Sequence, residues 1–452
     1  MRIRRKCSIK KCVYFALIGG LLAIIRFNFQ KNDGLDEQIV PVDQQQKREV
    51  KPKSPAIAKK PWYFKNGELY PGPAIDYSLG VQRQAIVHKL LPDQVLQNDR
   101  IANQLMYVPH NYAEIKTSGK LKTILLPHGL LKWNVTKGRE IFLSDKCPVD
   151  TCQITEDNAL ADTADMIIHK EFVKPMGKPL RKSKQINMIF SRAKYVQAPD
   201  TINWTASYRR ESTIVAPYMK WMYYNEQFQD KPQDRNFAEH KRKKVAWFVS
   251  NCKTENNRFK YALELQKYIE VDIYGECGKL RCSKSTPEKC FKLLEKNYKF
   301  YLAFENCNCK DYITQKFLVN ALDRGVVPIV MGARPEDYLA LAPRHSFIHV
   351  DNFDSPKALA AYLKVLDRND ELYNSYFMWR GTGEFIETYF WCRVCAMLHY
   401  DADLRKQQQN RSSNENLSSG MCSLSSWKGR AKTYDGTNHR GGLPIGYPMM
   451  RD

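Results

Sequence analysis

The chain has 452 residues and a formal net charge of +23, from 71 Lys and Arg against 48 Asp and Glu. Hydrophobic residues make up 43% and aromatic residues 12%, which excludes a mainly disordered chain, and the length suggests two or three domains. A basic surface attracts nucleic acid, acidic lipid, sulfated glycans or nucleotide phosphates, and charge alone does not choose among them.

The N-terminal segment is strongly basic and then apolar. Residues 1–60 contain 14 Lys and Arg and 5 Asp and Glu, and an apolar run covers residues 12–25. Extended to Phe29, the run has 18 residues, within the about 17–25 that span a membrane. With the basic flank on the cytosolic side, we expect a cytoplasmic tail (1–11), a transmembrane signal-anchor (12–29) and a lumenal remainder. A cleaved signal peptide is the alternative, but no convincing cleavage site follows.

Cysteines and glycosylation motifs agree with a secretory route. Of 13 cysteines, eleven lie beyond the anchor, so at least one thiol is left over. The close spacings Cys147/Cys152, Cys277/Cys282 and Cys392/Cys395 suggest local disulfide pairs. The CxxC at 392–395 could also begin a zinc site, but one such pair in a secretory chain favours a disulfide, and we predict no metal site. Further disulfide candidates are Cys290 and Cys422, and the N-glycosylation motifs are at Asn134, Asn203, Asn410 and Asn416.

Three regions precede the part with the clearest pattern. Residues 30–80 are polar and read as a stem without a fold. Residues 81–236 form a first domain, in which short apolar runs predict strands at 123–126, 166–169 and 186–190. Residues 399–452 form a polar tail, which Cys422 would fasten.

A second domain, residues 243–398, alternates apolar strands with helices. This pattern predicts an α/β fold with a doubly wound parallel sheet. The expected strands are 245–249, 271–274, 300–304, 326–330 and 347–350, and the expected helices are 258–268, 314–322 and 356–366.

Ligands of such sheets bind beyond the carboxyl ends of the strands. The segments to examine are therefore 250–251, 275–276, 305–306 and 331–332. Asp401-Ala-Asp403 resembles the DxD of metal-dependent sugar transferases, but it lies in a polar stretch and reads as a solvated surface.

Two cations stand at junctions between strands and helices of this domain. Lys316 falls in the first turn of an expected helix, where the helix dipole disfavours a positive charge. A bound phosphate would reverse that cost, and Arg258 is a second cation on the same expected face. A solvated lysine is the plainer interpretation, and the pattern by itself leaves both open.

Several segments resemble the α1,3-fucosyltransferases of glycosyltransferase family 10, most closely the branch that acts on the N-glycan core. They are residues 203–217 (NWTASYRRESTIVAP), 247–252 (WFVSNC), 271–275 (VDIYG) and 300–332 (FYLAFENCNCKDYITQKFLVNALDRGVVPIVMG). The resemblance implies a Golgi type II enzyme with two Rossmann-like domains in a GT-B arrangement. It implies inverting transfer of L-fucose from GDP-fucose to O3 of the innermost GlcNAc.

The resemblance also implies roles for the donor-binding residues. Arg258 and Lys316 would contact the diphosphate, and Glu305 would hold fucose or ribose hydroxyls. Tyr312 and Asn306 would shape the guanosine and sugar pocket, and Asn251 and Gln315 would complete it. No metal or other cofactor would be essential, although stimulation by a divalent cation stays open. The expected partners are GDP-fucose, a glycoprotein acceptor, the Golgi membrane and other Golgi transferases, and nucleic acid is not expected.

Two departures from the family pattern bear on catalysis. The family has a presumed catalytic Glu just before the NWT block, whereas residues 190–199 (FSRAKYVQAP) contain no acidic residue. Gln315 replaces the Glu of the family's T-E-K. Asp200 and Glu211 are the replacement bases that sequence proximity suggests, and Cys307, often Ser in the family, is the candidate for the leftover thiol.

Three functions are therefore carried forward. The first is a core-type fucosyltransferase, and the second is a degenerate homologue that binds GDP-fucose or glycan without turnover. The third is a basic lumenal protein that binds polyanions or glycans and has no nucleotide site. Saturable GDP binding separates the third from the others, and product formation separates the first from the second.

Overall fold

The computed structural model describes residues 59–73, 90–92, 99–173, 185–192, 201–282, 285–400 and 422–428. These all belong to one compact unit, residues 59–452. Within them, no helix has the length and apolar character needed to cross a membrane. The expected signal-anchor at residues 12–29 lies outside the described part of the chain.

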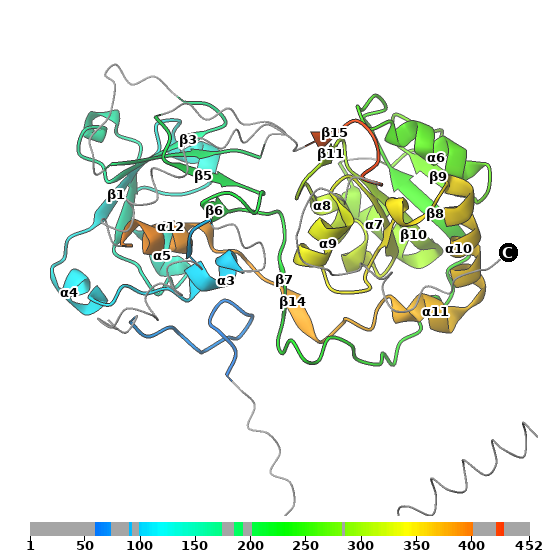
Figure 1. Ribbon diagram of the computed structural model, residues 1–452, viewed down its shortest axis with the longest axis horizontal. Coiled ribbons are helices and arrows are strands. Elements are labelled where there is room, and N and C mark those ends of the chain that lie inside the picture. The colour runs from blue at the N-terminus through cyan, green and yellow to red at the C-terminus, as the bar shows by residue number, and fades with distance from the viewer. Residues whose placement is uncertain are drawn as a thin grey trace, which may run out of the picture. The chain divides into compact units, whose positions relative to one another are not determined.

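Two parallel sheets form the framework (Figure 1). The first has the order β2-β1-β3-β4-β5-β6 and the second the order β13-β12-β10-β8-β9. The strands of the first sheet are β1 (Lys122–Leu125), β2 (Cys152–Thr155), β3 (Met166–Lys170), β4 (Ile186–Phe190), β5 (Trp204–Ser207) and β6 (Ile214–Val215). Those of the second are β8 (Lys243–Phe248), β9 (Val271–Tyr274), β10 (Tyr298–Phe304), β12 (Val327–Met331) and β13 (Ile348–His349).

Both sheets have the same topology. In each, the first strand in sequence lies between the second and the third, so the chain reverses its direction across the sheet after the second strand. This creates a switch point between β1 and β3 and another between β8 and β10. Loops at a switch point diverge and leave room for a ligand, so these two places are where a site is expected.

Helices cover both faces of the second sheet, which confirms the doubly wound arrangement. Alternate residues of a strand point to opposite faces. Phe300, Leu302 and Phe304 of β10 pack in one core with helices α6, α10 and α11, while Tyr301 and Ala303 pack in another with α7, α8 and α9. The helices are α6 (Arg258–Gln266), α7 (Pro287–Asn297), α8 (Gln315–Leu318), α9 (Pro335–Leu341), α10 (Pro356–Arg368) and α11 (Asp370–Ser375), with short 3₁₀ turns at Leu322–Arg324 and Val350–Asn352.

The first sheet packs most of its apolar side chains into a single core. Ile124, Met166 and Met188 lie in this core together with residues of α3, α5 and α12, and a small cluster around Leu125 and Ile167 covers the other face. The helices of this half are α3 (Arg100–Leu105), α4 (Tyr112–Thr117), α5 (Glu140–Ser144) and α12 (Phe390–Leu398), with 3₁₀ turns at Leu130–Trp133 and Asn158–Leu160.

Helix α12 packs in the first core. The expectation that the second domain extends to residue 398 is therefore wrong for α12. Trp391, Val394 and Met397 lie in that core, and α12 lies beside α3 and α5, as its orange ribbon shows (Figure 1). The helix is apolar on nearly every side, so the sequence alone leaves its partner undecided. The chain crosses twice between the two halves. The two crossing segments pair with each other as antiparallel strands, β7 (Trp221–Tyr223) and β14 (Gly383–Phe385).

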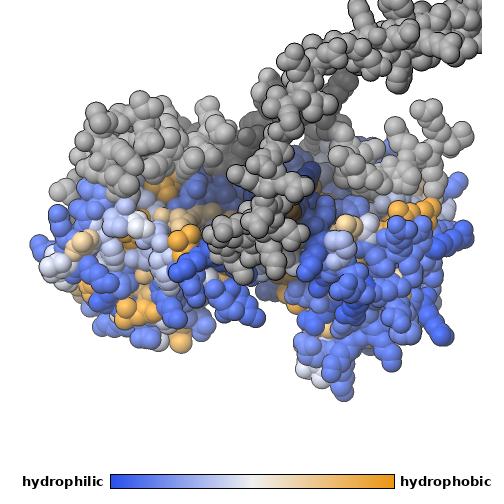
Figure 2. Space-filling model, turned by 90° about the horizontal axis from the view of Figure 1, so that it is seen from below, coloured by the Kyte–Doolittle hydropathy of each residue, from blue (hydrophilic) through white to orange (hydrophobic). Residues whose placement is uncertain are grey.

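The expectation of a stem without a fold is wrong for its last part. Trp62, Tyr63 and Phe64 are buried in the first core, and Trp62 donates its indole N–H to the carbonyl of Leu105 at 3.0 Å. Three consecutive aromatic side chains bury a large apolar area without any periodic pattern, which is why no strand or helix was predicted there. Figure 2 shows one face of the molecule, on which hydrophilic side chains predominate and apolar residues form small separate groups.

Candidate active site

The switch point of the second sheet brings Glu305 and Lys316 together. Glu305 directly follows β10 and is fully buried. Its carboxylate accepts hydrogen bonds from the backbone N–H of Thr314 at 2.8 Å, from the Thr314 hydroxyl, and from Nζ of Lys316 at 2.6 Å. A buried carboxylate is stable only when such donors and a cation compensate for its lost hydration. Glu305 therefore holds Lys316 at the strand end, and both its oxygen atoms are engaged there.

Gly332 makes room for that carboxylate. It follows β12 with φ +145°, and a Cβ atom there would lie 2.6 Å from Cβ of Glu305. Only glycine adopts this backbone conformation without strain, and only glycine leaves the space open.

Arg258 ties two strand ends together. Its guanidinium donates to the carbonyl of Phe304, the last residue of β10, at 2.6 Å and to the carbonyl of Asn251, beyond β8, at 3.0 Å. Burial lowers its pKa, and the charge of Glu305 opposes that shift. The side chain is 3% exposed, and its Nε is a buried donor without a hydrogen-bond acceptor among the described atoms. Arg258 thus supplies positive charge at the switch point while it braces the backbone.

The other predicted donor-site residues lie around Glu305 and Lys316 and differ in their exposure to solvent. Asn251, Asn306 and Gln315 are exposed, and Tyr312 is half-buried. The ring of Tyr312 packs against Tyr208 of the first half with centroids 5.2 Å apart. Burial raises the pKa of Tyr312, and the charge of Glu305 raises it further, so the phenol stays neutral. The structure thus places these residues around the carboxyl edge where the sequence expected them.

Glu211, one of the two expected replacement bases, lies in an ionic cluster between the halves. It pairs with Lys310 and, at 3.4 Å, with Arg209. Beside it, Arg210 pairs with the buried carboxylates of Asp311 and Asp337. This arrangement favours a structural role for Glu211. Asp200 lies outside the described residues.

The same cluster contains two buried carboxylates with opposite shifts. Burial and the charge of Asp337 raise the pKa of Asp311. Burial alone would raise the pKa of Asp337 too, but hydrogen bonds and charge from Arg334, with the charge of Arg210, hold it below its ordinary value. Arg210 therefore bridges the halves through both carboxylates, of which Asp337 ionises more readily.

The C-terminal segment is fastened through Cys422 as expected, and it reaches this edge, a place that the sequence did not predict. Residues Cys422–Ser423 form β15 and pair with β11 (Asn308–Cys309). Trp427 donates its indole N–H to the carbonyl of Gly332 at 2.8 Å and its backbone N–H to Asp351 at 2.9 Å. Cys422, isolated in a polar stretch, was the signal that predicted a fastened tail. The fastening is the Cys309–Cys422 disulfide.

The local cysteine pairs expected from spacing are wrong. The disulfides are Cys147–Cys392, Cys152–Cys395, Cys252–Cys277, Cys282–Cys290 and Cys309–Cys422. Two of them join α12 to β2 and to the loop that precedes it, across about 245 residues of sequence. Closely spaced cysteines on one helical turn point along the same face and meet a partner element instead. Cys307 forms no disulfide within the described residues and is buried, as expected for the leftover thiol.

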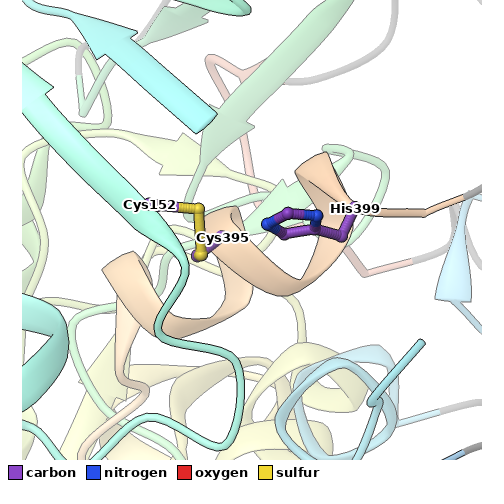
Figure 3. Close-up of side chains that lie close together, drawn as sticks. All are labelled: Cys152, Cys395 and His399. Atoms are coloured by element: carbon purple, nitrogen blue, oxygen red, sulfur yellow. A yellow bond between two sulfur atoms is a disulfide. The ribbon is translucent and has the colours of Figure 1, made fainter. Parts of the chain in front are cut away.

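One group of side chains has the spacing of metal ligands. Cys152, Cys395 and His399 lie close together (Figure 3), but the two sulfur atoms are bonded to each other. His399 Nε2 lies 2.9 Å from the hydroxyl of Thr151. Because disulfide sulfur atoms are not thiolates, this group is part of the packing of α12.

The glycosylation motifs fall in contrasting places. Asn134 is exposed in a left-handed turn after Leu130–Trp133. Asn203 lies between β4 and β5, where its Oδ1 accepts from the backbone N–H of Asn187 at 2.8 Å. Asn410 and Asn416 lie outside the described residues.

A separate cavity of about 600 Å³ opens at the opposite edge of the first sheet. Lys122 and Asp165, at the amino ends of β1 and β3, contribute to its lining, together with Tyr107 and Tyr400. None of the predicted donor-site residues lines it. The cavity is therefore distinct from the candidate site.

Two parallel α/β sheets with cations at a switch point are typical of proteins that bind phosphorylated ligands. Comparison with known families gives a narrower class. A family model described as glycosyltransferase family 10 (fucosyltransferase) C-term matches residues 238–415, and one described as fucosyltransferase, N-terminal matches residues 121–219.

Individual relatives agree with these matches. The chain is 60% identical over 378 residues to glycoprotein 3-alpha-L-fucosyltransferase A of Drosophila melanogaster, which covers 82% of this chain and 75% of the relative. It is 29% identical over 351 residues to alpha-(1,3)-fucosyltransferase C of Drosophila melanogaster, which covers 70% and 81%. A crystal structure of alpha1,3-fucosyltransferase with GDP-fucose aligns with a TM-score of 0.42 and 16% identity, over 62% of this chain and 91% of that one. The chain belongs to glycosyltransferase family 10, which confirms the resemblance seen in its motifs.

Proposed function

We propose that this protein transfers L-fucose from GDP-fucose to O3 of the innermost GlcNAc of glycoprotein N-glycans, with inversion at the anomeric carbon. The observation that carries the proposal is the placement of Lys316 and Arg258 at the switch point of the second sheet. Family membership and a 60% identical relative named glycoprotein 3-alpha-L-fucosyltransferase A support it.

In this proposal the second sheet binds the donor. Lys316 contacts the diphosphate, and its ammonium group is shared between Glu305 and the phosphate oxygens. Arg258 adds positive charge from below the strand ends. Asn306 and Tyr312 line the guanosine and sugar pocket, and Asn251 and Gln315 lie at its rim. As the bond from fucose to GDP breaks, charge develops on the departing diphosphate, and fixed cations stabilise it without reorganisation.

The acceptor binds on the side of the first sheet, in a GT-B arrangement of two Rossmann-like domains. Division of the two substrates between two domains suits an inverting transfer, because the base and the leaving group act on opposite faces of the sugar. Specificity for the core GlcNAc rests on the name of the close relative and on the motif resemblance.

We propose further that no metal is essential, because two cations already stand where the diphosphate binds. Incubation with EDTA is expected to leave the transfer rate within about twofold. We also propose that the protein is a single-pass type II protein of the Golgi membrane, on the basis of its basic and apolar first 29 residues. Localisation of the full-length chain with a C-terminal tag, with protease protection, tests this point.

The test of function uses the purified full-length chain from a secretory host. Labelled GDP-fucose and a core N-glycan glycopeptide are incubated with it, and mass spectrometry looks for one added fucose. An α1,3 linkage on the innermost GlcNAc is the expected product. Fucose on an antenna GlcNAc would contradict the acceptor assignment alone, and no product from folded protein would contradict the activity.

The degenerate homologue stays the second candidate because Ser191 and Arg192 follow β4 where the family has its base. For that function, GDP binds saturably and no product forms. If the protein instead binds polyanions and has no nucleotide site, no saturable GDP binding is expected.

A further inference from the structure

Glu171 lies at the switch point of the first sheet. It directly follows β3, the strand that neighbours β1, and the chain turns back across the sheet between these two strands. Ligands of parallel α/β sheets bind at this place, at the carboxyl edge. Among the described residues that directly follow β1, β3 and β4, which are Leu126, Glu171 and Ser191, Glu171 is the carboxylate.

The backbone of Glu171 is held in an uncommon conformation. Its φ is +67°, in the left-handed region that non-glycine residues seldom adopt. The backbone N–H of Glu171 donates to the carbonyl of Phe190 at 2.8 Å, so the end of β4 fixes this turn. Such local strain persists where the surrounding structure enforces it, and it is concentrated at functional sites.

The carboxylate itself is oriented but accessible. The hydroxyl of Ser191 donates to Oε2 of Glu171 at 2.7 Å, and the backbone N–H of Arg192 approaches Oε1 at 3.4 Å. Glu171 is nevertheless exposed to solvent. Ser191 and Arg192 stand where the family has its presumed base. They therefore hold the carboxylate of Glu171, which follows the neighbouring strand β3.

Tyr218 connects this carboxylate with the donor side. The guanidinium of Arg192 lies over its ring, 4.9 Å from the centroid. Burial raises the pKa of Tyr218, Arg192 lowers it, and the charges of both Glu305 and Glu171 raise it. Tyr218 thus experiences the charge of one carboxylate from each switch point, and Arg192 links it to the turn that holds Glu171.

We propose that Glu171 is the general base of this transferase, an inference that rests on the proposed function. As O3 of the acceptor GlcNAc attacks C1 of fucose, Glu171 takes the proton of that hydroxyl. The C1–O bond breaks, and its electron pair leaves with the diphosphate of GDP. The step needs no further reactant, and Glu171 becomes a neutral carboxylic acid that later returns its proton to water.

Glu211 is less suited to this role. Its carboxylate is paired with Lys310 and Arg209 inside the ionic cluster between the halves, whereas Glu171 has an open side. A base must reach the proton that it removes, so accessibility decides between the two.

The test compares Glu171→Gln with Glu156→Gln in the full-length chain. Glu156 is a matched control, because it is an exposed carboxylate that directly follows β2 of the same sheet and accepts from the backbone N–H of Leu130 at 3.0 Å. Glu171→Gln is expected to lower kcat by about 10²–10⁴-fold with unchanged affinity for GDP and unchanged Tm. Glu156→Gln is expected to stay within about twofold of wild type. Formate is expected to restore part of the activity of Glu171→Ala, because it replaces the missing carboxylate.

The outcomes separate the inference from the proposed function. If the wild type is active and Glu171→Gln keeps its kcat within about threefold, the base assignment is overturned and the transferase function stands. If Glu171→Gln loses GDP affinity and Tm together with kcat, Glu171 is structural and the assignment is again overturned. A folded wild type that makes no fucosylated product with any glycan acceptor overturns both.

Discussion

Oε2 of Glu305 accepts a hydrogen bond from Nζ of Lys316 at 2.6 Å, although the two residues lie eleven positions apart and belong to different elements. The carboxylate is fully buried, whereas the lysine side chain is 28% exposed. The buried carboxylate of Glu305 fixes the position of Lys316. The partly exposed ammonium group of Lys316 can then contact a ligand. In the proposed function, this pair forms the diphosphate site at the switch point of the second sheet.

Removal of the lysine should therefore weaken GDP binding. Lys316→Met is expected to raise the Kd for GDP about 10–100-fold, since a charge-assisted hydrogen bond contributes about 1.5–3 kcal/mol. The variant also leaves Glu305 buried without its cation, which lowers Tm. The double variant Glu305→Gln/Lys316→Met should recover much of the Tm and none of the GDP affinity, as calorimetry can show.

Lys244→Ala is the control for that measurement. Lys244 pairs with Asp367 at 2.8 Å, away from the carboxyl edge, so its loss should leave the Kd for GDP unchanged. Equal GDP affinity in wild type and Lys316→Met would remove Lys316 from the diphosphate site.

An added methyl group at Gly332 should disturb the same pair. Gly332→Ala places Cβ 2.6 Å from Cβ of Glu305 and forces alanine into a strained φ of +145°. We therefore expect a loss of stability of about 1–3 kcal/mol and weaker GDP binding. Gly138→Ala separates the two effects, because Gly138 has φ +96° and no atom within 4 Å of its added Cβ. If both variants bind GDP as the wild type does, the close approach to Glu305 is unimportant for the site.

The long-range disulfides should be visible by peptide mapping. Digestion without reduction is expected to yield Cys147 linked to Cys392, and Cys152 linked to Cys395. The double variant Cys152→Ala/Cys395→Ala is expected to lose about 2–5 kcal/mol of stability, since this bond closes a long loop and fastens α12. Peptides that link Cys147 to Cys152 would contradict the placement of α12 against the first sheet.

His169 should make stability depend on acid pH. Burial, with a smaller effect of His128, lowers its pKa from 6.5 to about 4. The unfolded chain therefore takes up a proton near pH 6.5, and the folded protein does so only near pH 4. This contribution is complete above pH 6.5 and is lost as the pH falls toward 4, about 2 kcal/mol by pH 5.

His169→Gln should remove this dependence. Urea unfolding at pH 7 and pH 5 is expected to show a smaller loss of stability in the variant than in the wild type, by about 2 kcal/mol. Both proteins keep His345 and His349, whose pKa values burial also lowers, so only the difference between the proteins counts. An equal loss in both would mean that His169 is protonated in the folded state.

Eight strands, β1, β3, β4, β8, β9, β10, β12 and β13, were predictable because each contains a short apolar run bounded by polar residues, whereas β2, β5 and β6 of the first sheet were not expected. The runs at 186–190 and 271–274 coincide with β4 and β9, and the other expected runs differ from the strands by at most two residues at either end. The positions of Glu305 and Lys316 followed, since carboxyl ends of parallel strands meet at one edge. The segment 331–332 was expected at the same edge, but the need for glycine at 332 was not, because it depends on the side chain of Glu305, which β12 brings close.

What the sequence determined by itself is the local pattern and the family. Apolar period, turn residues and the 300–332 segment act within a few residues, so they can be read without knowledge of the fold. Only the tertiary structure decided the partners of α12, the pairing of Cys147 and Cys392, and the meeting of Glu171 with Ser191. These contacts join residues that are distant in sequence, and many pairings satisfy the same local preferences. The packing of whole elements selects one of them, because it buries the most apolar surface with its polar groups paired.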